Sequence, residues 1–322
     1  MKAIVTEQAG GPEVLKYQEC PERQPGSGQV VVRVSAAGVN FMDIGVRKGT
    51  VWQDIPWPRI PGVEGAGVIL RTSDDVSEFV PGQRVAWVYA PGSYAEEVVI
   101  PASALVLIPD SIDDKTAASV MMQGLTASHF ATEFYPIQPG DIALVHAAAG
   151  GVGLLLTQII KHRGGRVIGR VSSESKVAMA KEAGADHVIV DTKGTFAAEV
   201  IRLTEGQGVH VVYDGSGPVT FQDSLNALRI AGTFCWYGPI LGAPDKIDIM
   251  SLPKSIKIGY ATFNHHVHTS ALLRKHTNIL FDWLLAGTLK VSIGKEYALA
   301  DAAQAHADME SRKTTGKLLL IP

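Results

Sequence analysis

A glycine-rich turn between an apolar strand and an apolar helix is the feature that most constrains how this chain folds. The strand is expected over residues 142–146 and the helix over 151–162, and three glycines lie at their junction. The alternation continues, with elements expected over 166–171, 174–183, 187–190, 209–213, 232–237 and 255–263. Strands alternating with helices of this length predict βαβ units, and about six such strands are typical of a doubly wound parallel sheet.

The first third of the chain has a different character. Short β-type runs at 29–35 and 83–89 are separated by Pro-Gly turns, which predicts a compact, barrel-like β domain. A helix is expected from Lys115 to about Tyr135, with Ser111 as its N-cap, and it is expected to link two domains. The tail predicts further elements: a helix ending near 287, a strand over 290–297, a helix over 300–311 and a strand over 316–321.

The glycine-rich junction reads Ala148-x-Gly150-x-x-Gly153, a GxGxxG fingerprint with Ala in the first position. Gly150 lets the backbone approach a pyrophosphate, Gly153 lets the helix pack closely on the strand, and the first N–H groups of the helix face the phosphate charge. A tight turn that binds nothing is the alternative, but the βαβ context favours binding. The candidate dinucleotide residues here are Ala149, Gly150, Gly151, Val152 and Gly153.

The end of the next strand selects the nucleotide. A site for NADH has an acidic side chain there to hold the ribose hydroxyls, but this chain has Val171. Ser172, Ser173 and Lys176 instead offer two hydroxyls and a cation for a 2′-phosphate, so NADPH is favoured over NADH. Arg170 adds to that charge only if its side chain points the same way. In the alternative interpretation, a serine caps the following helix and Lys176 is a solvated residue of its first turn.

Composition excludes several classes of protein. Among 322 residues, 32 acidic and 29 basic side chains give a net charge of −3, which provides no basic footprint for nucleic acid or an anionic membrane. Two cysteines, Cys20 and Cys235, are too few for a disulfide scaffold or a four-cysteine zinc lobe. The sequence shows neither a signal peptide nor an apolar run of membrane-spanning length, so a cytoplasmic protein is expected.

Several ordered motifs together resemble the zinc-independent quinone oxidoreductases, the zeta-crystallin-like branch of the medium-chain dehydrogenase/reductases. The resemblance extends over almost the whole chain. It is carried by Ala36-Ala-Gly-Val-Asn-Phe-Met-Asp43, Ile60-Pro-Gly-Val-Glu-Gly-Ala-Gly67, Met122-Gln-Gly-Leu-Thr126, His146-Ala-Ala-Ala-Gly-Gly-Val-Gly153, Val212-Tyr-Asp-Gly215, Ala305-His306, Glu310-Ser-Arg312 and Thr315-Gly316.

This resemblance implies an α/β fold in which a GroES-like β domain is combined with a doubly wound Rossmann domain. Residues 1–120 are expected to form the GroES-like domain, 121–264 the dinucleotide-binding domain, and 265–322 the return to the first domain. It implies a homodimer, formed by pairing of an edge strand within residues 254–263. It also adds Asn40, Thr126, Gly215, Tyr237 and Gly238 to the expected NADPH contacts.

The zinc-binding relatives of this family have a catalytic cysteine where this chain has Asn40, and a histidine where it has Val63. Neither replacement supplies a thiolate or an imidazole, so no metal site is expected. The cluster His265, His266 and His268 is read as solvated rather than metal-binding. A metal-free site favours conjugated acceptors, because a quinone or enone accepts hydride without the Lewis acid that helps an alcohol lose its proton.

The resemblance assigns Asn40 and Asp43 to the polar floor of the catalytic cleft, where hydride passes to a quinone. Asn40 has an alternative role as a turn residue after a strand, and Asp43 has one as a partner of Arg47 within its own helical turn. Among the imidazoles, His129 has the only plausible place near the reaction. Reduction of α,β-unsaturated carbonyl compounds is the closest alternative activity, and a non-catalytic NADPH-binding, crystallin-like role is the third.

Two positions depart from the family pattern. Gly45 stands where a tyrosine associated with the quinone pocket is expected, so the pocket is wider or differently lined. Asp191 stands where a tyrosine often follows the third strand of the dinucleotide domain, near the adenosine, and its charge opposes a 2′-phosphate. Val51, Trp52 and Trp57 are candidates to cover an acceptor, although aromatic residues in loops usually pack locally.

Overall fold

The computed structural model describes residues 1–238 and 246–322, and within them the chain divides into two compact units. Unit 1 comprises Met1–Gln123, Val267–Ala286 and Val291–Pro322, and unit 2 comprises Gly124–His266 and Gly287–Lys290. These borders lie close to the expected ones at 120/121 and 264/265. The short segment Gly287–Lys290, however, belongs to unit 2 and not to the tail of unit 1.

Unit 1 is built on a seven-stranded sheet in the order β14-β15-β3-β4-β5-β7, with β6 also paired to β3. All its pairings are antiparallel except that of β14 with β15. Its strands are β3 (Gln29–Val39), β4 (Glu64–Thr72), β5 (Arg84–Val88), β6 (Glu97–Pro101), β7 (Leu105–Leu107), β14 (Ile293–Ala298) and β15 (Lys317–Ile321), and a separate ribbon pairs β1 (Lys2–Val5) with β2 (Lys16–Glu19). Alternating apolar residues such as Val30, Val32 and Val34 bury one face of β3 in the core.

Four helices begin within unit 1: α1 (Phe41–Arg47), α2 (Asp114–His129), α7 (Ser270–Leu285) and α8 (Ala302–Glu310). The α2 helix crosses the border of the two units and continues as a π-helical turn, Phe130–Phe134. The expectation that Ser111 caps this helix is wrong. Asp113 performs that role, because its carboxylate accepts the Thr116 N–H at 2.9 Å, three residues along the chain.

Unit 2 contains a six-stranded parallel sheet in the order β10-β9-β8-β11-β12-β13. The strands are β8 (Ile142–His146), β9 (Arg166–Val171), β10 (His187–Val190), β11 (Val209–Asp214), β12 (Leu228–Trp236) and β13 (Lys257–Tyr260). This order, with the first strand in the middle and the chain winding outward in both directions, confirms the predicted doubly wound Rossmann fold. The edge strand β13 lies where it was expected but is shorter than residues 255–263.

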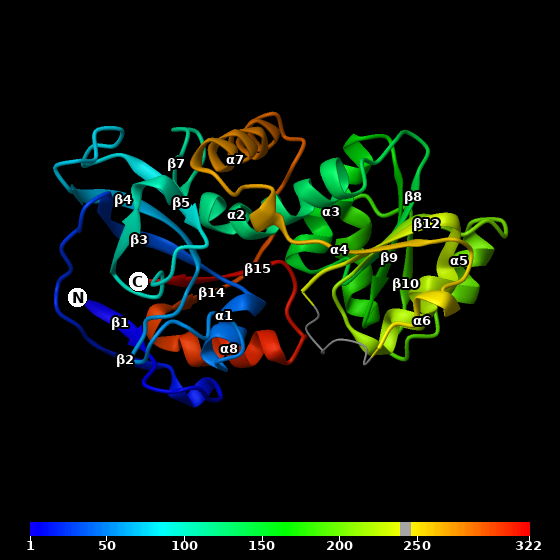
Figure 1. Cartoon of the computed structure of the whole chain (residues 1–322), viewed down its shortest axis with the longest axis horizontal. Coiled ribbons are helices and arrows are strands. Elements are labelled where there is room, and N and C mark those ends of the chain that lie inside the picture. The colour runs from blue at the N-terminus through cyan, green and yellow to red at the C-terminus, as the bar shows by residue number, and fades with distance from the viewer. Residues whose placement is uncertain (239–245) are drawn as a thin grey trace. The chain divides into compact units, whose positions relative to one another are not determined.

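The helices of unit 2 are α3 (Gly151–His162), α4 (Val177–Glu182), α5 (Ala197–Leu203) and α6 (Pro218–Ala227). In Figure 1, α3 and α4 lie on one side of the strands and α5 and α6 on the other. The last two were not predicted, although Pro218 at the first position of α6 is a recognised start signal. Leu144, Ile168, Val212 and Phe234 form part of the core beneath α5 and α6. Among the described residues, no helix has both the length and the apolar character to cross a membrane.

Candidate functional site

The glycine-rich turn joins β8 to the N-terminus of α3, and its geometry explains the glycines. A Cβ atom on Gly153 would lie 2.4 Å from the Ala147 carbonyl oxygen and 2.8 Å from the Ala148 Cα, so a side chain here would separate helix from strand. A Cβ on Gly150 would lie 3.1 Å from the same oxygen. The first N–H groups of α3 have no partner within the helix, which makes this terminus suited to an anion.

Ser172, Ser173 and Lys176 follow the end of β9, next to this turn. Ser172 is exposed, and Ser173 and Lys176 are partly exposed. The segment Glu174–Lys176 is a 3₁₀ turn, and Ser173 precedes it without capping it through its side chain, because its hydroxyl contacts Ser175 Oγ at 2.9 Å. The Ser173 side chain therefore does not cap this turn.

A chain of buried polar groups runs behind the glycine-rich turn, along the carboxyl ends of β8 to β11. Arg170 donates to Asp191 at 2.9 and 2.7 Å, and its Nη1 lies 3.5 Å from His146 Nδ1. Because arginine only donates, the proton of His146 belongs on Nε2, which lies 3.0 Å from Ser224 Oγ. Ser224 in turn donates to Asp214 at 2.9 Å. Burial lowers the pKa of His146 to about 4, so this imidazole is neutral.

The remaining predicted cofactor residues of unit 2 lie after the ends of β11 and β12 and on α2. Gly215 is packed against Tyr237, since a Cβ there would lie 2.8 Å from the tyrosine ring. The Tyr237 ring is 4.7 Å from that of Phe130, and Gly238 is exposed. Thr126 is partly exposed on α2. His129 lies with its ring 4.9 Å from that of His266, a pairing that the sequence did not reveal.

Asn40 follows β3 and precedes α1, and its amide is held by a buried ion pair. Lys317 Nζ donates to Asn40 Oδ1 at 2.9 Å and also to Glu64 Oε2. Asn40 Nδ2 donates to Glu64 Oε2 at 2.8 Å and makes a longer contact of 3.3 Å with the Gly38 carbonyl. Glu64 and Lys317 have no exposed side-chain surface, and Asn40 is 5% exposed.

Asp43 lies in the same cluster and is completely buried. Its Oδ2 accepts the Asn40 N–H at 2.8 Å and the Tyr94 hydroxyl at 3.0 Å, whereas its buried Oδ1 has no hydrogen-bond partner among the residues that the structure describes. Burial raises the pKa of Asp43 to about 7. The alternative role as a partner of Arg47 is wrong, because Arg47 forms its ion pair with Glu310 at 2.9 Å.

Arg47 also begins a directional chain of hydrogen bonds toward Asp43. Its Nη1 lies 3.2 Å from His306 Nδ1, which must accept, so His306 Nε2 carries the proton and points to the Tyr94 hydroxyl at 3.0 Å. Tyr94 then donates to Asp43. Burial and the neighbouring Arg47 lower the pKa of His306 to about 3, so this imidazole is also neutral.

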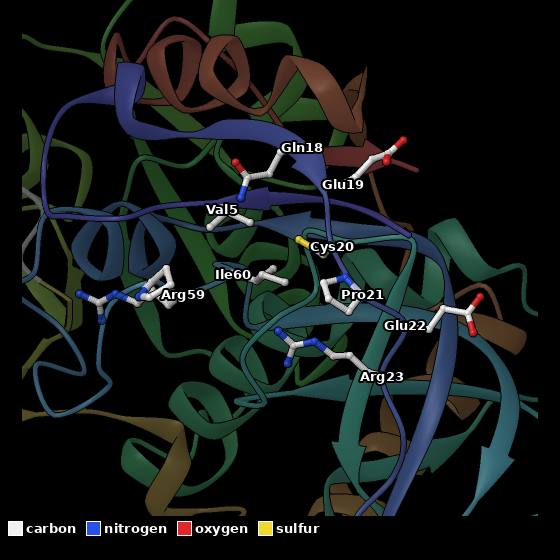
Figure 2. A pocket seen from close by; sticks show the side chains of 10 residues that line it. Val5, Gln18, Glu19, Cys20, Pro21, Glu22, Arg23, Arg59 and Ile60 are labelled. Atoms are coloured by element: carbon white, nitrogen blue, oxygen red, sulfur yellow. The ribbon is translucent and has the colours of Figure 1, made fainter.

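A separate surface hollow of about 370 Å³ lies in unit 1, between the end of β2 and the segment before β4. Figure 2 shows Cys20 and Ile60 near its middle, while the carboxylates of Glu19 and Glu22 point outward. None of the residues predicted for the site lines this hollow. It therefore has no part in the candidate site.

Comparison with known families agrees with this architecture. Residues 26–110 match the alcohol dehydrogenase GroES-like domain, and residues 151–275 match the zinc-binding dehydrogenase family. The chain is 36% identical to a quinone oxidoreductase of Pseudomonas aeruginosa over 97% of both chains, and 35% identical to a 2-haloacrylate reductase of a Burkholderia species over 99% of this chain and 98% of that one. It superposes on the Escherichia coli quinone oxidoreductase complexed with NADPH with a TM-score of 0.96, at 32% identity and full coverage of both chains. The chain belongs to the quinone oxidoreductase family of the medium-chain dehydrogenase/reductases.

The departure of Gly45 from the quinone oxidoreductase pattern has a structural explanation, and the positions of the zinc ligands in the zinc-binding relatives can also be located. A Cβ on Gly45 would lie 2.6 Å from Val51 Cγ2, so the space that a side chain at position 45 needs is taken by the following loop. At the positions of the zinc ligands, the Asn40 amide is hydrogen-bonded to Lys317 and Glu64, and Val63 is buried. Among the residues described, no cluster of three or more His, Cys, Asp or Glu side chains is placed to hold a metal ion.

Sequence reasoning missed most of the buried partners of the candidate site residues. Glu64 and Lys317 are charged residues beside apolar runs, in Pro61-Gly-Val-Glu64 and Lys317-Leu-Leu-Leu-Ile321, and a charge at such a position is a signal of a buried pair. Nothing in the local sequence connects them, because they are 253 residues apart. Arg170 and His146, each at or near the end of a strand, carry a similar signal.

Proposed function

We propose that this protein is an NADPH-dependent, metal-independent reductase that transfers a hydride to quinones, with other α,β-unsaturated compounds as related acceptors. The observation that carries the proposal is the set of residues that follow the carboxyl ends of β8 and β9 in the unit 2 sheet. The glycine turn there requires Gly153, and Ser172, Ser173 and Lys176 follow β9, whose last residue is Val171 and not an acidic residue. The likeness to quinone oxidoreductases and to a 2-haloacrylate reductase supports both acceptor classes.

The residues of this edge fit NADPH. The N-terminus of α3 suits the pyrophosphate, and the two serines with Lys176 suit the 2′-phosphate. Gly215, Tyr237, Gly238 and Thr126 are assigned to the rest of the cofactor. The bound cofactor supplies the hydride from C4 of its nicotinamide.

Asn40 is proposed as the residue that contacts the acceptor or the nicotinamide. Asp43 holds it in place by accepting its backbone N–H. The 3.3 Å contact of Asn40 Nδ2 with the Gly38 carbonyl is its weakest hydrogen bond, so this N–H is the one available to a substrate oxygen. The other amide contacts, to Lys317 and Glu64, keep the side chain in place. Chelation should leave activity unchanged, because neither Asn40 nor Val63 can bind zinc.

A turnover assay separates the candidate activities. NADPH absorbance is followed with simple quinones, with 2-alkenals and with buffer alone. Faster oxidation with quinones supports the proposal, and faster oxidation with 2-alkenals supports the enone reductase. Binding of NADPH without turnover of either class would mean a non-catalytic role and would overturn the proposed activity.

Direct hydride transfer is tested with NADPH deuterated at C4. Single-turnover reduction of the acceptor should be slowed by deuterium on one of the two faces of the nicotinamide. If neither label slows a reaction whose chemical step is rate-limiting, hydride transfer is excluded. Elemental analysis of the same preparation should find no stoichiometric zinc.

The contribution of Lys176 is a test of the cofactor assignment. Lys176→Ala should weaken NADPH binding by about 1.5–3 kcal/mol, the scale of a charge-assisted hydrogen bond, and should leave NADH binding almost unchanged. Titration of cofactor fluorescence measures both affinities. Equal affinity of the wild-type protein for NADPH and NADH would contradict the assignment.

A homodimer is proposed through β13, the edge strand of the unit 2 sheet. Tyr260 on this strand is 60% exposed, and an exposed strand edge is normally covered or paired. Pairing with the same strand of a second copy extends the sheet across a two-fold axis. Light scattering at micromolar concentration should give the dimer mass, and a monomer mass would contradict it.

Cys20 and Cys235 are free thiols, which supports the proposed cytoplasmic location.

A further inference from the structure

Asp191 brings a carboxylate to the edge of the sheet where the 2′-phosphate is expected. It directly follows β10, and its N–H donates to the carbonyl of Val171, the last residue of β9, at 3.0 Å. Val190 and Val171 are paired in the parallel register. Asp191 is therefore one strand away from the segment that carries Ser172 and Ser173, and ligands of such sheets bind at these strand ends.

This carboxylate is ionised. Burial opposes its ionisation, but the hydrogen bonds from Arg170 and from the N–H groups of Thr195 and Gly194 outweigh that effect and hold the pKa of Asp191 at about 2. If the charge of Asp191 were not paired, it would repel the 2′-phosphate of NADPH and favour NADH, whose ribose carries only hydroxyls.

Arg170 is placed to remove that repulsion and is itself held in place. Its guanidinium contacts Asp191 at 2.7 and 2.9 Å, lies 5.1 Å from the centre of the Phe196 ring, and has its Nη1 3.5 Å from His146 Nδ1. The Arg170 and Asp191 side chains are only 10% and 8% exposed. These contacts keep Arg170 against Asp191 and do not direct it to the segment that carries Ser172.

We propose that Arg170 determines the preference for NADPH over NADH by neutralising Asp191, without touching the cofactor. Ser172, Ser173 and Lys176 can attract the 2′-phosphate only because the nearby carboxylate is already paired. This inference rests on the proposed function, since it assumes that the cofactor lies at this edge of the sheet. It makes Arg170 a residue of specificity and not a phosphate ligand.

The test uses equilibrium binding to the intact protein, not turnover. Dissociation constants for NADPH and NADH are measured by titration of cofactor fluorescence for the wild type and for R170Q, D191N and R170Q/D191N. Arg202→Gln is the matched control, because Arg202 forms an exposed pair with Glu199 on α5, at 2.6 Å, in the same unit. Thermal unfolding of each variant shows whether it is folded.

R170Q is expected to weaken NADPH binding by about tenfold, the scale of one charge interaction near a protein surface, and to change NADH binding by less than about twofold. D191N should keep or increase the preference for NADPH. The double variant lacks both charges and should return the ratio of the two constants to within about threefold of the wild-type value. Arg202→Gln should leave both constants unchanged.

Several results would overturn the inference. Equal weakening of both cofactors in R170Q would show a purely structural pair, and a double variant that retains the R170Q ratio would show that Arg170 contacts the phosphate itself. If R170Q fails to fold, the double variant and Arg170→Lys decide, because both avoid an unpaired carboxylate and both must keep the preference for NADPH. A wild-type protein that binds neither cofactor would contradict the proposed function as well, whereas the other outcomes leave that function intact.

Discussion

Two aspartates, one in each unit, show how the same side chain is treated in opposite ways. Asp43 in unit 1 is completely buried, accepts only two hydrogen bonds on one oxygen, and has its pKa raised to about 7 by burial. Asp191 in unit 2 is partly buried, and the hydrogen bonds from Arg170 and from backbone N–H groups outweigh the effect of burial, so that its pKa is about 2. Burial alone therefore does not decide the charge of a carboxylate. The donors around it do.

The reason lies in how each cluster distributes its cations. In unit 1, Lys317 is bonded to Glu64 and Asn40, and Arg47 is bonded to Glu310, so neither of these two cations forms an ion pair with Asp43. In unit 2, Arg170 is bonded to Asp191 directly. In unit 1, the Asn40 amide is therefore held beside the Asp43 carboxyl group, whose pKa is near neutral. In unit 2, the ion pair of Arg170 and Asp191 places fixed charges at the strand ends.

Removal of Lys317 should produce the largest effect on this comparison. Lys317→Met leaves the buried Glu64 with two of its hydrogen bonds, from Asn40 at 2.8 Å and from the Met122 N–H at 2.7 Å, and without its cation. Breaking one side of a buried pair typically costs about 3–5 kcal/mol, which denaturant unfolding measures. The matched control is the double variant Glu64→Gln/Lys317→Met, which should lose clearly less than the single one. A single variant as stable as the wild type would show that the pair is not a unit.

The pH dependence of stability should reveal Asp43. Its pKa is about 7 when folded and about 3.9 when unfolded, so the folded state retains a proton that the unfolded state releases between these values. The stability that Asp43 contributes is therefore complete below about pH 4 and is lost as the pH rises to 7. At about 1.4 kcal/mol per pKa unit the loss is at most about 4 kcal/mol.

Asp43→Asn removes this proton exchange. Urea unfolding at a series of pH values should give a difference between variant and wild type that shifts in favour of the variant from pH 4 to 7 and is constant above. A difference that does not change with pH would show that Asp43 is ionised at all these values. The comparison with Asp191 would then no longer hold.

His146 should give a dependence of the opposite sign in unit 2. Its pKa is lowered by burial to about 4 from an ordinary value near 6.5, so the unfolded state binds a proton that the folded state refuses. Stability is complete above about pH 6.5 and falls as the pH decreases toward 4, by at most about 3 kcal/mol. His146→Gln should abolish this part of the fall in urea unfolding. The lowered pKa of His306 also makes the stability fall as the pH decreases. The same measurement on His306→Gln shows how much of the total fall comes from that residue.

The balance between prediction from sequence and discovery in the structure differs between the two units. In unit 2, periodicity and the glycine turn predicted β8, α3 and β9 with their observed bounds, because local sequence determines a strand, a tight turn and an apolar helix. The polar chain behind them was not predicted, since the contacts of Asp191 and Ser224 depend on which strands become neighbours. Asp191 was expected to oppose a 2′-phosphate, and only the structure shows its charge paired with Arg170.

In unit 1 the motif around Asn40 and Asp43 was found through family resemblance, and the partners of both were missed. From the C-terminal tail, Lys317 on β15 contacts Asn40, and His306 on α8 contacts Tyr94, which donates to Asp43. No local pattern predicts contacts between segments more than 200 residues apart. The tertiary fold determines the charge state of these side chains, and local sequence determines only their position on a strand or helix.

Asn40→Ala should have the smallest effect of these changes in energy and the most informative one for function. The variant removes the N–H assigned to the acceptor, so kcat/KM should fall by about tenfold to a hundredfold, the scale of one neutral hydrogen bond lost in the transition state. NADPH affinity should remain nearly intact, because the residues assigned to its phosphates belong to unit 2. Asn278→Ala, at an exposed position of α7, is the matched control and should leave both quantities unchanged. Loss of NADPH affinity together with kcat/KM would instead assign Asn40 to the cofactor, and unchanged kinetics would mean that its amide serves only to hold Glu64 and Lys317 in place.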